Sequence, residues 1–230
     1  MKIAGIVANS TVDYPQTLSA VIFTGGCNMN CFFCHNKKLI TNDFESIAEN
    51  KVWEFLKKRQ GLLDGIVISG GEPTIQPDLI EFIRKVKILE YKVKLDTNGN
   101  KPEVIEKLLE DNLLNYVAVD YKAPWARYYE FCKCAGENLQ KTLQILKNAS
   151  INWEARTTML PHLTKAEYIT MAQEIFELPR YVLNPYRIPN AFEKDNRSQI
   201  EKEPYPPSFL KEIAKEVKRF QPNTELCDFN

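Results

Sequence analysis

Cys27, Cys31 and Cys34 lie within eight residues of one another, in the order Cys-x3-Cys-x2-Cys. Three thiolates on one short loop can bind a single inorganic centre. Iron–sulfur clusters usually take four cysteines. Three protein ligands would therefore leave one iron of a four-iron cluster open to a further molecule, much as a catalytic zinc site keeps an open position. The spacing predicts one [4Fe–4S] cluster on this loop, and Gly25 and Gly26 allow the backbone to turn sharply before it.

Two other interpretations of these cysteines remain open. A structural zinc site would need a fourth ligand, which usually comes from a second, separated pair. His35 is adjacent to Cys34 and is poorly placed to complete the same tetrahedron, and Cys132-Lys-Cys134 is not a usual zinc motif. The loop cysteines could also be incidental core thiols, and for Cys132, Cys134 and Cys227 we expect this role, as small buried hydrophobic residues.

The composition is that of an ordinary globular protein, with 230 residues, 44% hydrophobic and 26% charged. We expect a single domain over residues 1–230, with a core at about 15–190. The formal net charge is zero, which gives no reason to expect binding to nucleic acid or to an anionic membrane. No apolar run is long enough for a transmembrane helix, and the first residues make a poor signal peptide, so we expect a cytoplasmic protein.

Strand and helix patterns alternate along the chain. Strands are expected at residues 18–23, 65–69, 92–96, 116–120, 153–160 and 181–186. Helices are expected at residues 47–59, 78–89, 101–109, 137–147, 165–176 and 207–220. This alternation predicts an α/β fold with parallel strands, either a partial (β/α)6 barrel or an open sheet.

The residues best suited to chemistry follow the ends of these strands. Cys27 follows the first strand, Glu72 the second, Asp96 begins the turn after the third, and Asp120 ends the fourth. In parallel α/β folds, binding and catalysis take place at the carboxyl ends of the strands. We therefore expect these side chains to lie along one edge of the sheet.

Several of these residues could bind a ligand or could serve the fold alone. Gly70 and Gly71 would let a ligand lie against the backbone, with Glu72 accepting hydrogen bonds from an ammonium group. The same residues could form a plain turn, as could Asp96 to Asn98.

The charged residues on the later strands are equally open to two interpretations. Lys122 could pair with a ligand carboxylate while Asp120 holds it, or the two could form a surface ion pair. Arg156, within an expected strand, would need an anionic partner if it pointed inward, and would be a solvated charge if it pointed outward. Arg187 has the same ambiguity.

The cysteine loop, with Phe33 before its last cysteine, resembles the signature of the radical S-adenosylmethionine (SAM) superfamily, and Gly70-Gly71-Glu72 resembles that family's GGE motif. The resemblance implies that the open iron binds the amino and carboxylate groups of SAM. Reductive cleavage of SAM then gives a 5′-deoxyadenosyl radical. It also implies that SAM binding involves Phe33, Gly70, Gly71, Glu72, Asp96, Asn98, Asp120, Lys122 and Arg156.

Further motifs resemble the activating enzymes of glycyl-radical enzymes. They are Val12-Asp13-Tyr14-Pro15, Cys34-His35-Asn36, the stretches 69–74, 96–99 and 119–124, and Arg156-Thr157-Thr158. Among these enzymes the chain is most similar to those acting on anaerobic ribonucleoside-triphosphate reductase. The implied partners are that reductase and a flavodoxin or ferredoxin-like electron donor. A related activating enzyme has a histidine where this chain reads Asn184-Pro-Tyr-Arg187.

Alternatives from other classes remain at this point. The chain could activate another glycyl-radical enzyme such as pyruvate formate-lyase, or act on a small molecule or RNA. It could also be a non-catalytic zinc-binding module. The lack of cysteines between Cys34 and Cys132 argues against a second cluster in that stretch.

Overall fold

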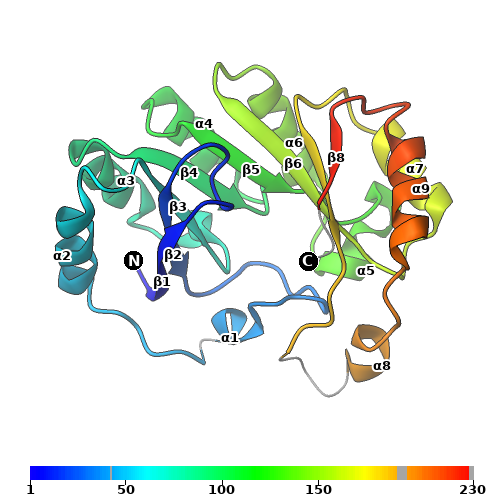
Figure 1. Ribbon diagram of the computed structural model, residues 1–230, viewed down its shortest axis with the longest axis horizontal. Coiled ribbons are helices and arrows are strands. Elements are labelled where there is room, and N and C mark those ends of the chain that lie inside the picture. The colour runs from blue at the N-terminus through cyan, green and yellow to red at the C-terminus, as the bar shows by residue number, and fades with distance from the viewer. Residues whose placement is uncertain (42, 191–195, 228–230) are drawn as a thin grey trace. The chain divides into compact units, whose positions relative to one another are not determined.

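Strands and helices alternate along the computed structural model, which describes residues 1–41, 43–190 and 196–227 (Figure 1). The strands are β1 (Ile3–Ser10), β2 (Ser19–Thr24), β3 (Gly65–Gly70), β4 (Lys92–Thr97), β5 (Tyr116–Asp120), β6 (Asn152–Met159), β7 (Tyr181–Pro185) and β8 (Thr224–Leu226). The helices are α1 (Lys37–Ile40), α2 (Glu49–Arg59), α3 (Leu79–Ile88), α4 (Pro102–Glu110), α5 (Tyr128–Cys132), α6 (Glu137–Lys147), α7 (Lys165–Gln173), α8 (Arg197–Ile200) and α9 (Pro207–Val217). The six expected strands are confirmed to within one residue at each end.

The contacts divide the chain into two compact units. The first unit comprises Met1–Asn28, Asn36–Ala118 and Asn138–Asn152, and the second comprises Met29–His35, Val119–Glu137 and Trp153–Asn230. Strand β5 contributes its first three residues to the first unit and its last two to the second.

In the first unit, β2, β3 and β4 are parallel and β1 pairs antiparallel with β2. Val21 lies opposite Val67, and Ile66 opposite Val93, so branched apolar side chains are neighbours across the strands. The first four residues of β3 are all buried, as expected for a strand with both faces covered. Helices α2 and α3 of this unit bury apolar side chains at helical spacing, among them Val52 and Leu56 of α2.

In the second unit, β6, β7 and β8 are parallel, with Thr157 opposite Leu183 and Val182 opposite Glu225. Helices α7 and α9 contact each other, and α9 contacts β8 (Figure 1). Parallel pairing in both units confirms the predicted α/β class.

Two strands and several short helical segments were not predicted from the sequence. In strand β1 only Ile3 and Ser10, at its two ends, are buried, so its hydrophobic pattern is weak, and β8 has just three residues. Helices α1, α5 and α8 have four or five residues each, too few to show helical periodicity. Helix α9 ends at Val217, three residues before the expected end at Phe220.

Among the helices that the structure describes, none combines the length and the apolar character needed to cross a bilayer.

The buried Gln221 side chain links the end of α7 and the segment after it to the residues before β8. The Gln221 amide donates to the carbonyls of Ala172 and Phe176, at 2.9 and 3.1 Å, and its oxygen accepts from the Leu178 N–H at 2.9 Å. Gln221 is 1% exposed, so water cannot replace these bonds without local rearrangement.

We expect Gln221→Ala to lower the free energy of unfolding by about 1–3 kcal/mol, because it leaves buried backbone groups without partners. Denaturant unfolding followed by circular dichroism measures the change. Gln173→Ala, at an exposed position of α7, is the matched control and should stay within about 0.5 kcal/mol of the wild type. Equal effects of the two substitutions would contradict this role for Gln221.

Candidate functional site

The three loop cysteines are divided between the two compact units. Cys27 lies in the first unit, and Cys31 and Cys34 lie in the second. Within the described residues, no group of three or more His, Cys, Asp or Glu side chains is arranged to hold a metal ion.

In the first unit, Gly70 and Gly71 bring the end of β3 against the backbone that leads to Cys27. Gly70 has φ +125°, and a Cβ there would lie 2.3 Å from the Thr24 nitrogen and oxygen. A Cβ on Gly71 would lie 1.9 Å from the Gly26 oxygen. The expected reason for these glycines was close approach of a ligand. That reason stays a prediction, and the structure supplies another, which is the close approach of Thr24 and Gly26 backbone atoms.

Glu72 joins the ends of β3 and β4. Its Oε1 accepts from the Thr74 N–H at 3.0 Å, from the Thr74 hydroxyl at 2.6 Å and from the Thr97 hydroxyl at 2.7 Å. Its Oε2 accepts from the Asn98 N–H at 2.7 Å. The side chain is 0% exposed; burial raises the pKa of Glu72, and these hydrogen bonds act against that shift. The carboxylate therefore faces its own chain.

Asn98 extends this connection to the cysteine loop. Its side-chain amide donates to Asn28 Oδ1 at 2.8 Å and contacts the Cys27 sulfur at 3.8 Å. An N–H directed at a sulfur favours its thiolate form. Asp96, at the end of β4, forms an ion pair with Lys94, which is 1% exposed. Two predicted site residues, Cys27 and Asn98, are thus in contact.

In the second unit, the two phenylalanines between Cys31 and Cys34 contact other aromatic rings and a cation. Phe32 and Phe33 pack edge to face with ring centroids 5.2 Å apart, and Phe32 also contacts the ring of His162 at 5.0 Å. The Lys122 ammonium lies 6.0 Å from the centroid of the Phe33 ring. The predicted residues Phe33 and Lys122 are therefore neighbours.

Asp120, Lys122 and Arg156 form a triad with one negative and two positive charges. Lys122 Nζ lies 2.9 Å from Asp120 Oδ2, and Arg156 Nε lies 3.2 Å from Asp120 Oδ1. Burial would raise the pKa of Asp120, but the two cations outweigh it and the pKa is lowered. Burial opposes the charge of Lys122, yet Asp120 and the Cys31 thiol hold its pKa above the ordinary value. Arg156 thus has the anionic partner that an inward orientation would require.

Three residues beside Cys31 were not predicted as part of the site. Cys132 is 0% exposed and hydrogen-bonds with Cys31, and that bond together with burial raises the pKa of its thiol. Cys134 interacts electrostatically with Cys31, and burial raises its pKa to about 11. Among the described residues, the buried Tyr128 hydroxyl has no hydrogen-bond partner, and it lies in the electrostatic field of these thiols and of Asp120. In the sequence, the Cys-x-Cys spacing of Cys132 and Cys134 was the feature that could have indicated them.

The two remaining sequence candidates lie elsewhere in this unit. His35 hydrogen-bonds to the backbone of Arg187, and burial lowers the pKa of its imidazole. The Cys227 N–H donates to the Leu183 carbonyl at 2.9 Å, next to β8. Neither observation assigns chemistry to the Arg187 or Cys227 side chain.

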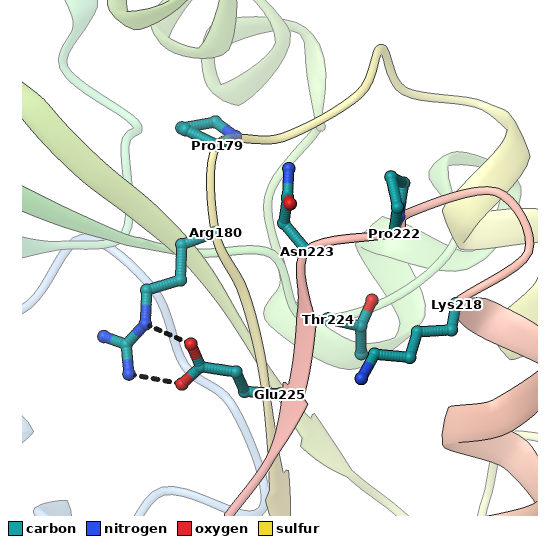
Figure 2. A pocket seen from close by; sticks show the side chains of 7 residues that line it. All are labelled: Pro179, Arg180, Lys218, Pro222, Asn223, Thr224 and Glu225. Atoms are coloured by element: carbon teal, nitrogen blue, oxygen red, sulfur yellow. Dashed lines mark hydrogen bonds and ion pairs between the residues drawn. The ribbon is translucent and has the colours of Figure 1, made fainter.

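A hollow in the second unit lies at the start of β7 and β8 (Figure 2). It is lined by Pro179, Arg180, Lys218, Pro222, Asn223, Thr224 and Glu225. Arg180 forms an ion pair with Glu225 across it, with Nη2 2.6 Å from a carboxylate oxygen. This is the amino end of the strands, opposite the edge where parallel α/β folds place their chemistry.

Comparison with known proteins assigns the family. Residues 21–175 match the family model described as the Radical SAM superfamily. A protein of Methanocaldococcus jannaschii, provisionally named a glycyl-radical enzyme activating enzyme, is 36% identical over 240 residues, spanning 99% of this chain and 96% of that protein. The chain belongs to the radical SAM superfamily and its glycyl-radical activating family. The resemblance to the radical SAM superfamily and to the activating enzymes of glycyl-radical enzymes is thereby confirmed, and a radical SAM enzyme replaces the zinc-binding module.

Solved radical SAM enzymes share the fold. SuiB of Streptococcus suis bound to SAM aligns with a TM-score of 0.67 and 17% identity, over 88% of this chain and 48% of that one. The chain thus spans about half the length of SuiB. A domain of pyruvate-formate lyase-activating enzyme from Bacteroides vulgatus aligns with a TM-score of 0.56 and 15% identity, over 71% of this chain and 99% of that domain.

The residues around Cys31 fit a thiolate-bound, negatively charged group. Lys122 supplies a compensating positive charge, and the unpartnered Tyr128 hydroxyl supplies a buried donor. In the first unit, the Asn98 amide is directed at the Cys27 sulfur. Radical SAM proteins carry a [4Fe–4S] cluster and bind SAM, and these donors suit the sulfurs of such a cluster.

Glu72→Gln should destabilise the protein by about 1–3 kcal/mol, because both carboxylate oxygens accept backbone N–H groups and glutamine offers one oxygen. One buried N–H would then face the glutamine NH2. Thermal unfolding of the cluster-free chain measures the loss independently of any ligand.

The matched control is Glu106→Gln on the exposed face of α4, which should leave the melting temperature unchanged. If Glu72→Gln unfolded like that control, the carboxylate would not be the connection between the ends of β3 and β4.

Proposed function

We propose that the protein cleaves SAM reductively and generates a glycyl radical on an anaerobic ribonucleoside-triphosphate reductase. The similarity to a glycyl-radical enzyme activating enzyme over nearly the full chain carries the reaction class. The choice of reductase is supported by the motifs that resemble this group of activating enzymes. A flavodoxin or ferredoxin-like protein is the proposed electron donor.

We assign Cys27, Cys31 and Cys34 as ligands of one [4Fe–4S] cluster. When bound, the cluster and SAM supply one-electron chemistry, which is reductive cleavage of the sulfonium and removal of a hydrogen atom from a substrate carbon. Asn98 stabilises the Cys27 thiolate through its amide N–H, and Lys122 offsets negative charge near Cys31.

Lys122 and Arg156 are the proposed contacts for the carboxylate and ribose hydroxyls of SAM. Asp120 holds both cations and cancels one of their charges, so the triad keeps a net positive charge for an anionic group. Lys122 also lies over Phe33, the residue before Cys34, which places this charge against the cysteine loop. That contact is the observation in the structure that best supports SAM binding here.

The residues at the ends of β3 and β4 have a related role in the proposal. Gly70, Gly71 and Asp96 would line the SAM site. Glu72 acts as a positioning residue, because its carboxylate is taken up by Thr74, Thr97 and Asn98.

Anaerobic reconstitution with iron and sulfide should give brown protein with about four irons and four sulfides per chain. After reduction and addition of SAM, the wild type and Cys227→Ala should release 5′-deoxyadenosine, and Cys31→Ala should not. Zinc in place of iron, with no 5′-deoxyadenosine from any variant, would overturn the cluster assignment.

The partner is tested in the same assay by electron paramagnetic resonance. A glycyl-radical signal should appear with anaerobic ribonucleoside-triphosphate reductase. A signal with pyruvate formate-lyase instead would keep the reaction class and replace the reductase.

Lys122→Met should raise the KM for SAM by about 10- to 150-fold, because a hydrogen bond to a charged group contributes about 1.5–3 kcal/mol. Formation of 5′-deoxyadenosine at varied SAM concentration measures the change, with iron content checked in parallel. Lys141→Met, on the exposed face of α6, is the control. An unchanged KM in a fully iron-loaded Lys122→Met variant would remove Lys122 from the SAM site.

A further inference from the structure

A second thiol lies directly against one of the loop cysteines. Cys31 and Cys132 are neighbours, although about a hundred positions separate them in the sequence: the residues that flank them are in contact, and Cys31 raises the pKa of the Cys132 thiol as its hydrogen-bond partner. Both belong to the same compact unit, and their exposed fractions are 6% and 0%.

Two neighbouring contacts hold this thiol pair in register. The Asn30 N–H donates to the Cys132 carbonyl at 3.2 Å, so the residue before Cys31 is bonded to the backbone of Cys132. The rings of Phe32 and Phe131, which flank the two cysteines, lie 5.8 Å apart. A backbone hydrogen bond and ring packing thus bring the residues Cys31 and Cys132 side by side.

The chain turns sharply after Cys132. Lys133 ends α5 in the left-handed conformation, with φ 57°. Cys134 follows this turn and is more exposed than Cys132. The two cysteines of the Cys-x-Cys pair therefore differ in position, and Cys132 makes the hydrogen bond to Cys31.

We propose that Cys132 is a resolving thiol for Cys31, with which it forms a reversible disulfide when the chain lacks its cluster and meets peroxide. Hydrogen peroxide oxidises the Cys31 thiol to a sulfenic acid and is itself reduced to water. The Cys132 sulfur then attacks the Cys31 sulfur, the S–O bond breaks, and a second water leaves with the Cys132 proton. A dithiol reductant restores both thiols by exchange.

The disulfide would protect a metal-binding cysteine from irreversible damage. A sulfenic acid without a nearby thiol is oxidised further to sulfinic and sulfonic acids, which thiol reductants do not reverse. This protective meaning rests on the proposed function, because it takes Cys31 as a cluster ligand, whereas the disulfide chemistry itself does not.

The test uses the full-length chain, reduced, freed of iron by a chelator and then treated with hydrogen peroxide. After alkylation and unfolding, trypsin cleaves after Lys133 and separates Cys132 from Cys134. Chymotrypsin cleaves after Phe32 and Phe33 and separates Cys31 from Cys34. Mass spectrometry should find a Cys31–Cys132 disulfide in the wild type and in the matched control Cys134→Ser.

In Cys132→Ser, Cys31 should instead carry sulfinic or sulfonic acid. Iron uptake after peroxide and then dithiothreitol should recover in the wild type and in Cys134→Ser, and should stay low in Cys132→Ser. A wild type that forms a Cys31–Cys34 or Cys132–Cys134 disulfide, or that is over-oxidised at Cys31 like the variant, would overturn the proposal.

The two proposals can fail separately. A chain that forms the Cys31–Cys132 disulfide but never takes up iron, even before peroxide, would contradict the cluster assignment and keep the disulfide. A chain that takes up iron but forms no Cys31–Cys132 disulfide would contradict the disulfide proposal and leave the cluster assignment in place.

Discussion

The buried carboxylate of Glu72 fixes the relation between the ends of β3 and β4, and through it the surroundings of Cys27. It accepts the Asn98 N–H, and the Asn98 side chain then reaches both Asn28 and the Cys27 sulfur. The backbone at Gly71, just before Glu72, can lie against the Gly26 carbonyl because glycine has no Cβ to clash with it. A carboxylate that accepts hydrogen bonds from Thr74, Thr97 and Asn98 thereby helps to position the side chain in contact with the first cysteine of the loop.

Charge balance plays the corresponding part in the second unit. Asp120 holds Lys122 and Arg156 together, and its negative charge keeps the pKa of Lys122 above the ordinary value. The cation is positioned by a residue on its own strand end, so its place does not depend on a bound ligand. Such a preorganised positive charge costs little reorganisation when an anionic group binds.

The sequence predicted the six central strands because they are short apolar runs that end in polar or turn-forming residues. It could not predict β1, where two fully buried residues give too weak a pattern, or the three-residue β8. The spacing of the loop cysteines was visible locally in the sequence, and their assignment to a cluster stays a prediction. The contact between Cys31 and Cys132 was not visible in the sequence, because it depends on tertiary folding across about a hundred positions. Nor could residue type alone show that the Glu72 carboxylate would face Thr74, Thr97 and Asn98.

The buried Tyr128 hydroxyl, which has no hydrogen-bond partner within the described part of the chain, has a consequence for the lifetime of the protein in a cell. A buried donor without an acceptor costs about 1–3 kcal/mol, and that cost is removed by any bound group that accepts its hydrogen bond. Ligand binding and folding are then linked, since a ligand that binds only the folded state shifts the unfolding equilibrium. Protein molecules that have lost such a group would unfold more often, and cellular proteases would degrade them before molecules that retain it.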